Sequence, residues 1–319
     1  MVIDYQIQTT ASDGKFSPRE CVKMAKENDV LSIAITDHDT VGGINEALEA
    51  GKELGMEVIP GIELSCEYEK WGIHILGFGI DCSHQRLLQI LGDFKRARET
   101  RAQNGIENLK RYGFAVEFEA VNKRAKGVIS RVHVAEEIME NPANVEKLRT
   151  ENIVTRQDLF NAYLADEAPK SVFVSHSSLT PEEAAEVIHE AGGVAIWSHP
   201  LIPMGMVIKD KNQLYKLVEE TLGKFLEQGL DGIEVFSNAD EDGTEFLITL
   251  SEKYKILKTA GTDFHDTYID PKKPAEGSAQ IGGYPTYGYS TDGIREALLA
   301  AIEKRKALLV GGGTLVVTC

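Results

Sequence analysis

Short β-branched segments alternate with amphipathic segments along most of the chain, and this alternation limits the possible folds more than any other feature. VIDYQIQ (2–8) and LSIAITD (31–37) are typical of strands, and each precedes a segment with helical periodicity. The alternation resumes at 180–193, where Thr180, followed by proline and acidic residues, predicts the start of a helix. Repeated strand–helix units predict an α/β fold with a parallel sheet, either closed into a barrel or doubly wound.

The middle of the chain departs from this alternation. MEVIPGIELSCEY (56–68) and WGIHILGFGID (71–81) predict two strands in succession, joined by a turn at Glu69-Lys70. The stretch that follows has little strand character and strong helical periodicity, so we expect a helical insertion at 83–170. The insertion would divide the barrel into two segments, 1–82 and 171–319.

Composition and charge exclude several classes of partner. The 319 residues carry a formal net charge of −16, whereas proteins that bind long nucleic acid are usually basic, so we expect no long duplex partner. The start MVIDYQ lacks a leader pattern, and no apolar run approaches the roughly 20 residues of a membrane span. The four cysteines lack metal-site or redox spacing, so we expect reduced thiols in a cytoplasmic protein without membrane association. Protein partners leave no signal in the sequence.

Acidic, histidine and glutamine side chains gather where the predicted strands end. A single such residue is most simply explained as a helix cap or a buried, hydrogen-bonded group. The whole set favours metal ions, because histidine and carboxylate together are the ligands of Zn, Mn or Fe clusters. The set comprises Gln6, Gln8, Asp13, Asp37, His38, Asp39, Glu63, His74, His199, Asp263 and His265.

The order of short motifs resembles the polymerase-and-histidinol-phosphatase (PHP) family of metal-dependent phosphoesterases. The motifs are TDHDT (36–40), GIELS (61–65), HILGFGID (74–81), WSHP (197–200) and GTDFHD (261–266). Two segments of the insertion, ISRVHVA (129–135) and KSVFVSH (170–176), resemble the subgroup that dephosphorylates nucleoside 3′,5′-bisphosphates and trims RNA 5′ ends. The resemblance implies a distorted seven-stranded (β/α) barrel of PHP type that holds two to three divalent ions, Mn, Fe or Zn.

The resemblance also implies three sets of metal ligands. The first set would be Gln6, Gln8, Glu63 and Asp263; the second Glu63, His74 and His199; the third Asp13, His38 and His265. Glu63 would then bridge two ions.

The chain departs from the family pattern at its first motif. Family members have His-x-His after the first strand, whereas this chain has Gln6 and Gln8 before the retained TTASDG. Alternate residues of a strand point to one face, so the pair is placed to hold one ion. Amide oxygen suits hard cations better than Zn or Fe, so we expect this site to be weak, empty, or filled by Mg or Mn. The alternative is that both glutamines only form hydrogen bonds.

Four residues of the insertion segments match positions that contact phosphate in the subgroup. They are Arg131, His133, Lys170 and His176. The family's Ser-Arg-Pro-His is Ser-Arg-Val-His here, which keeps the charges. An arginine fork suits phosphate oxygens, and Arg131 would neutralise charge that develops during hydrolysis. His199, His265 or a metal-bound water would protonate the leaving oxygen.

These expectations favour a metal-dependent phosphoesterase that hydrolyses a phosphomonoester of a small nucleotide, such as a nucleoside 3′,5′-bisphosphate. A 5′→3′ exonuclease on short oligoribonucleotides is a second enzymatic interpretation. A third is a phosphate- or nucleotide-binding protein with weakened catalysis, because Gln6 and Gln8 replace ligand histidines.

Overall fold

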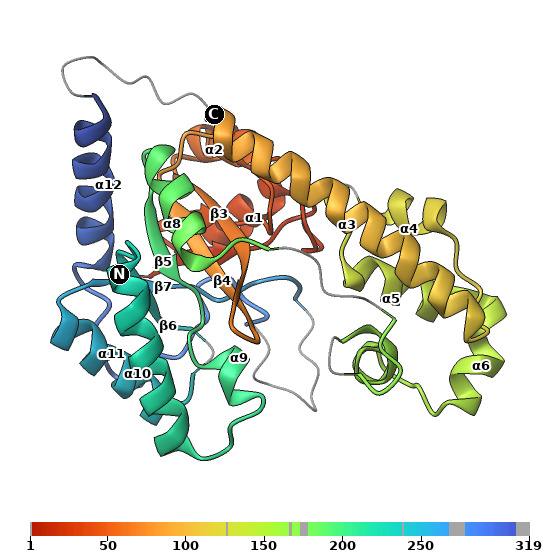
Figure 1. The fold of residues 1–319 in the computed structure, drawn as a ribbon. Coiled ribbons are helices and arrows are strands. Elements are labelled where there is room, and N and C mark those ends of the chain that lie inside the picture. The colour runs from red at the N-terminus through yellow and green to blue at the C-terminus, as the bar shows by residue number, and fades with distance from the viewer. Residues whose placement is uncertain are drawn as a thin grey trace.

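Seven strands form one sheet whose spatial order follows the chain. A computed structural model describes residues 2–125, 127–165, 168–172, 178–237, 239–267 and 278–310 (Figure 1). The strands are β1 (Ile3–Ile7), β2 (Ser32–Ile35), β3 (Glu57–Tyr68), β4 (Trp71–Phe78), β5 (Val194–Trp197), β6 (Gly232–Phe236) and β7 (Leu257–Ala260).

The sheet closes on itself just beyond β7. A parallel bridge joins Ile7 to Phe264, and the amide of Gln8 donates to the carbonyl of Phe264 at 2.9 Å. The α/β class and the distorted seven-stranded barrel are therefore confirmed. The sheet is not wholly parallel, because β4 runs antiparallel to both β3 and β5. The predicted turn at Glu69-Lys70 makes this possible, and Glu69 adopts a left-handed φ of 55° there.

Helices of the barrel cover the outside of the sheet. They are α1 (Pro18–Glu27), α2 (Ile44–Leu54), α8 (Pro181–Glu190), the short α9 (Ile202–Gly205), α10 (Lys211–Glu227), α11 (Glu241–Tyr254) and α12 (Ile294–Val310). Thr180 caps α8 through a reciprocal capping box with Glu183, as the sequence predicts. The helix that follows β2 begins at Ile44, and Gly43 occupies its cap position without a side-chain hydrogen bond.

The helical stretch between β4 and α8 lies beside the barrel in Figure 1. It contains α3 (Gln85–Arg111), α4 (Phe118–Arg124), α5 (Arg131–Glu140), η1 (Pro142–Asn144), α6 (Val145–Thr150), α7 (Arg156–Leu159) and η2 (Phe160–Leu164). Most of its buried side chains, among them Ile106, Leu109 and Tyr163, form a cluster of their own, whereas Leu87, Leu91 and Phe94 at the start of α3 belong to the barrel core. This separation supports our proposal that 83–170 is an insertion between barrel segments 1–82 and 171–319.

Two sequence expectations about chemistry and membranes can be compared with the structure. Cys21 and Cys66 are buried free thiols, in line with the expectation of reduced cysteines. Cys319 lies outside the described residues. No helix in the described ranges combines the length and the apolar character that crossing a bilayer requires.

The insertion core depends on one buried amide. Asn144 accepts from the backbone N–H of Ala115 at 2.7 Å and donates to the carbonyls of Ala115 and Ile138 at 2.9 and 3.0 Å. We expect Asn144→Ala to lower the free energy of unfolding by about 1–3 kcal/mol, because it leaves buried backbone groups unsatisfied. Urea denaturation measures this change, with the exposed Asn161→Ala as control. Equal midpoints for the two variants would contradict the prediction.

Candidate metal centre and substrate cavity

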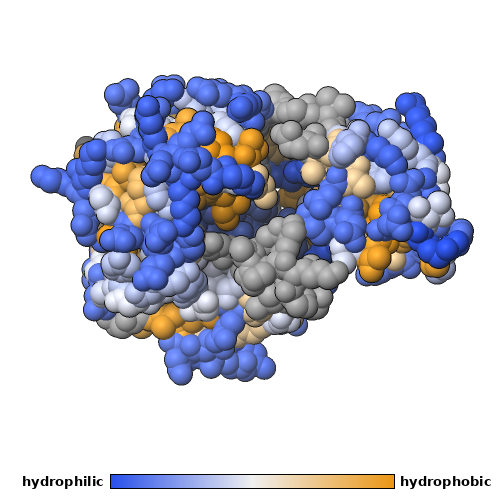
Figure 2. All heavy atoms as spheres, turned by 90° about the horizontal axis from the view of Figure 1, so that it is seen from below, coloured by the Kyte–Doolittle hydropathy of each residue, from blue (hydrophilic) through white to orange (hydrophobic). Residues whose placement is uncertain are grey.

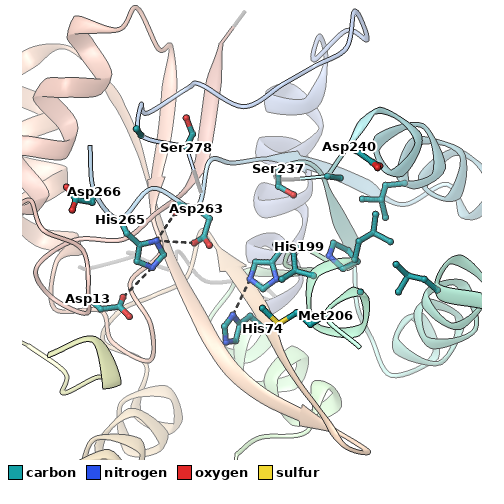
Figure 3. A pocket seen from close by; sticks show the side chains of 18 of the residues that line it. Asp13, His74, His199, Met206, Ser237, Asp240, Asp263, His265, Asp266 and Ser278 are labelled. Atoms are coloured by element: carbon teal, nitrogen blue, oxygen red, sulfur yellow. Dashed lines mark hydrogen bonds and ion pairs between the residues drawn. The ribbon is translucent and has the colours of Figure 1, made fainter. Parts of the chain in front are cut away.

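Histidine and carboxylate side chains from several strand ends converge at one end of the barrel (Figure 3). In each of two overlapping groups, the possible ligand atoms all lie within 4.8 Å of one another. The groups are Asp13, His38 and His265, and His38, Glu63 and His74. The first group is the complete third set that the sequence implies, and the second group contains two residues of the second set.

Asp13 and Asp263 flank His265 in the first group. His265 Nε2 lies 3.6 Å from Asp13 Oδ1, and His265 Nδ1 lies 3.7 Å from Asp263 Oδ1. Burial alone lowers the pKa of His265, but the two carboxylates outweigh it and raise the pKa to about 9. Without a cation, the site therefore holds a proton at neutral pH that a metal ion must displace.

Glu63 is the fully buried centre of the second group. Its Oε1 lies 3.0 Å from His74 Nδ1 and 3.3 Å from His199 Nε2, and its Oε2 lies 3.6 Å from His38 Nδ1. Burial raises the pKa of Glu63, but the surrounding imidazoles more than compensate and hold it well below its usual value. The structure thus brings all three residues of the second set into contact.

Gln6 and Gln8 also face Glu63, but through nitrogen. Gln6 Nε2 donates to Glu63 Oε1 at 3.1 Å and to Ser198 Oγ at 2.8 Å. Gln8 Nε2 donates to Glu63 Oε2 at 2.5 Å, while its Oε1 accepts from the Ser12 hydroxyl and the His38 amide, both at 3.1 Å. Gln6 at the end of β1 and Gln8 just after it point to the same face, as expected. Both side chains form hydrogen bonds, which is the alternative to metal binding that the sequence leaves open.

Unsatisfied polar atoms test whether these residues suit metal ions. Buried polar atoms of native proteins nearly always have hydrogen-bond partners. Here six buried atoms around the centre have none among the described residues: Gln6 Oε1, Asp13 Oδ1, His38 Nδ1, His199 Nδ1, Glu234 Oε1 and Asp263 Oδ1. The second and third sets offer imidazole and carboxylate, and so fit divalent transition ions. The first set offers only oxygens, and Gln8 Oε1 is already occupied, so a hard cation such as Mg is the better match.

Three acidic residues that the sequence does not place as ligands hold the centre in shape. Asp37 accepts from the amide and hydroxyl of Thr9 and from the hydroxyl of Ser12, each at 2.7 Å. Asp37 thus orders the loop after β1, as a buried, hydrogen-bonded group. Glu234 accepts from the amide of His199 at 3.0 Å, and the His199 backbone has a left-handed φ of 31°. The sequence contains one signal for the role of Glu234, namely its position on the strand that precedes the GTDFHD motif.

Asp39 ties the centre to the insertion. It accepts from the amide and hydroxyl of Ser65 at 2.8 and 2.9 Å, and from Arg98 Nε on α3 at 3.0 Å. Its backbone amide donates to the carbonyl of Glu63 at 2.9 Å, and its φ is 52°. Arg98 lies within a helical run that has no motif, so no sequence pattern marks it as a site residue.

The four predicted phosphate contacts are placed differently from one another. Arg131 is the first residue of α5 and donates to the carbonyl of Leu164 at 3.1 Å. His133 Nδ1 accepts from the amide of Ser130, so this ring helps to cap α5. Lys170 pairs with Glu151 at 2.7 Å and does not line either cavity described below. His176 lies outside the described residues.

Two cavities meet at the convergent side chains, and Asp13, His74 and Val132 line both. The first, of about 760 Å³, extends from His199 and Asp263 toward α9 and α10. The second, of about 550 Å³, extends toward the insertion and contains four cationic side chains, Lys70, Arg98, Arg101 and Arg131. Figure 2 shows the molecule hollowed between its larger and smaller parts.

Comparisons with known proteins show what this chain is similar to. The model of the PHP domain matches residues 4–166. A 5′-3′ exoribonuclease of Haemophilus influenzae is 32% identical, covering 82% of this chain and 89% of its own. A 3′,5′-nucleoside bisphosphate phosphatase of Chromobacterium violaceum is 29% identical, covering 88% and 90%. The solved structure of an amidohydrolase from Chromobacterium violaceum, with bound sulfate and no metal, has a TM-score of 0.76, 26% identity, and coverage of 94% and 97%.

Restoring imidazole at positions 6 and 8 tests the first ligand set. We expect Gln6→His with Gln8→His to bind one additional Mn or Zn ion per chain, because imidazole suits these ions better than amide does. Each single change should add less, since one imidazole leaves the ion short of a ligand. Elemental analysis of protein never exposed to chelator measures the content. Three tightly bound transition ions in the unaltered chain would contradict the prediction.

Metal affinity should rise with pH. Because the pKa of His265 is raised to about 9, the ring is protonated below that pH and the proton opposes metal binding. We expect Mn or Zn affinity to increase about tenfold per pH unit between pH 6 and 8, with release of a proton. Calorimetric titration in buffers of different ionisation enthalpy measures both. His265→Gln should bind more weakly with a flatter pH dependence, and an unchanged profile would remove His265 from the site.

Proposed function

The chain belongs to the PHP-domain family of metal-dependent phosphoesterases, and from this premise we propose that it hydrolyses a phosphomonoester of a small nucleotide, such as a nucleoside 3′,5′-bisphosphate. The relative from Chromobacterium violaceum named for that activity supports the proposal. We place the protein in the cytoplasm as part of the same proposal.

The cationic cavity beside the metal-ligand cluster is the observation that carries this proposal. The chain as a whole has a net charge of −16, yet this cavity is lined by four cationic side chains, of which Arg98 is paired with Asp39, and by only two carboxylates, Asp13 and Glu67. Such a concentration in an acidic protein favours an anionic ligand. A substrate with two phosphates suits the arrangement, because one phosphate reaches the ligand cluster while the other contacts arginine.

The residues of the centre would hold two to three divalent ions, in the sets led by Glu63 and His265, with a weaker Mg or Mn position at Gln6. Bound there, such ions polarise a phosphoryl group and lower the pKa of a water molecule. Arg131 lines the cationic cavity and would neutralise charge on phosphoryl oxygens, since a guanidinium fork matches their geometry.

The leaving oxygen needs a proton, and two histidines lie where they can supply it. His199 and His265 both line the larger cavity, on the same side as Asp263. Glu234 holds the backbone of His199 and so keeps its ring directed at Glu63. We propose that one of these two imidazoles is the general acid, through the ring nitrogen that does not ligate an ion.

The second candidate is a 5′→3′ exonuclease on short oligoribonucleotides. The specific observation in its favour is that the two cavities share Asp13 and His74, so a chain longer than one nucleotide has room on both sides of the ligand cluster. The relative from Haemophilus influenzae carries that name. Release of mononucleotides from a 5′-phosphorylated trinucleotide would favour this candidate over the first.

Four proteins with Gln or His at positions 6 and 8 test the proposal by activity. We expect phosphate release from adenosine 3′,5′-bisphosphate with Mn to be measurable in the unaltered chain and faster in the double-histidine variant. If the unaltered chain binds the compound tightly without turnover, it is a binding protein with weakened catalysis. A double variant that is no faster would show that Gln6 and Gln8 are not displaced ligands.

Replacement of Arg131 tests the cationic cavity. We expect Arg131→Ala to raise KM for the bisphosphate about 10- to 100-fold, since a hydrogen bond to a charged group contributes about 1.5–3 kcal/mol. The control Arg149→Ala removes an exposed arginine of the insertion that lines neither cavity. Steady-state kinetics measure the effect, and unchanged constants for Arg131→Ala would remove it from the site.

A further inference from the structure

Helix α3 is shared between the barrel and the insertion, and a charged residue lies where it passes from one to the other. Its buried residues between 87 and 94 pack in the barrel core, whereas those between 102 and 109 pack in the core of the insertion. In Figure 1 the helix runs from the barrel to α4 and α6. Arg98 lies on the same face, where the helical periodicity calls for an apolar side chain. A charge in this place is tolerated only with a partner.

The guanidinium of Arg98 holds the loop that carries His38. Arg98 Nε and Nη2 both donate to Asp39 Oδ2, the first at 3.0 Å, and Nη2 also donates to Ser65 Oγ at 3.0 Å. Asp39 is buried and keeps a left-handed φ of 52°, which a non-glycine residue adopts only where its surroundings enforce it. His38, the preceding residue, belongs to both groups of candidate ligands. Arg98 therefore influences the position of His38 through Asp39.

A second contact between the insertion and the barrel lies beside Asp13. The amide of Val128 donates to the carbonyl of Ala11 at 3.0 Å, two residues before Asp13. The two backbones are in direct contact, because a β-carbon on Gly127 would lie 1.8 Å from the same carbonyl oxygen. Only glycine permits this approach, so the insertion rests on the loop that carries Asp13.

A third contact lies beside His265. Lys15 Nζ lies 3.3 Å from Asp266 Oδ2, next to His265 in the chain. The same ammonium lies 3.9 Å from Glu136 Oε1 on α5. Because Lys15 is half exposed, this ion pair contributes little by itself. Its place matters more than its strength, since each of the three residues of the third ligand set has a contact with the insertion beside it.

We propose that Arg98 is a positioning residue through which the docked insertion sets the cation affinity of the third ligand set. The inference rests on the proposed metal-dependent function and does not depend on which substrate is cleaved. The second set should be independent of the insertion, because barrel residues hold it, as Glu234 holds the backbone of His199. Coupling between two sites is reciprocal, so a cation in the third set should in turn favour the docked insertion.

Mn binding to the full chain tests this proposal by calorimetric titration. We expect two tight Mn sites in the unaltered chain, and Arg98→Met should weaken one of them about 10- to 100-fold, the usual cost of losing a group that orients a ligand. In the His265→Gln background, which retains only the second set, Arg98→Met should leave the Mn affinity unchanged. Arg98→Lys should restore part of the affinity, because it returns the charge without the planar fork.

A matched arginine separates positioning from general damage. Arg124→Met removes a half-buried arginine that pairs with Glu137 and Glu140 inside the insertion. It should leave both Mn affinities unchanged, because Arg124 contacts neither the barrel loops nor the ligand groups.

A glycine variant tests the docking without altering Arg98, and it decides the matter if the Arg98→Met chain does not fold. Gly127→Ala forces the insertion away from Ala11, so it should also weaken the third set and spare the second. The control Gly223→Ala places a β-carbon where nothing lies within 4 Å, and it should change neither affinity.

Hydrogen exchange at the amide of Val128 measures the reciprocal effect. Mn should slow this exchange in the unaltered chain, and Arg98→Met should abolish the slowing, whereas Arg124→Met should preserve it. Equal weakening of both Mn sites by Arg98→Met, no weakening, or exchange that is indifferent to Mn overturns the coupling while the proposed phosphatase stands. An unaltered chain that binds no Mn contradicts the inference and the proposed function together.

Discussion

The buried carboxylate of Glu63 is the interaction on which this end of the barrel depends. A fully buried charge is tolerated only where partners compensate it, and here they come from separate strands. Gln6 and Gln8 donate from β1, His38 follows β2, His74 belongs to β4 and His199 follows β5. The side chain of Glu63 therefore links the ends of these strands to one another. The same convergence of side chains forms the ligand groups.

The glutamine pair alters what that carboxylate requires. Two neutral amides satisfy one oxygen each of Glu63 without adding charge, so this side of the centre is hydrogen-bonded even without a cation. The other side differs, because Asp13 and Asp263 rely on His265, whose raised pKa of about 9 reflects their uncompensated charge. The centre thus has two different sides. The carboxylate of Glu63 is hydrogen-bonded by the chain itself, whereas the carboxylates of Asp13 and Asp263 lack a compensating positive charge other than His265.

The insertion completes the site from outside the barrel. Arg98 of α3 reaches Asp39 beside His38, and Arg131 begins α5 at the wall of the cationic cavity. The barrel side of the site is largely apolar beyond His199, around Leu201 and Tyr215.

The sequence alone determined the α/β class, and its resemblance to the PHP family implied the barrel and the ligand sets of its centre. The alternation of strands and helices indicates the element order, and period two places Gln6 of β1 and Gln8 just after it on one face. Only the tertiary structure decided which amide atom faces Glu63, because Ser12 and the backbone of His38 occupy the oxygen of Gln8. Tertiary contacts likewise turned Asp37 toward Thr9 and paired Lys170 with Glu151. Local sequence patterns specify the element and the face on which a residue lies. The partners of its side chain come from distant segments, which only folding brings together.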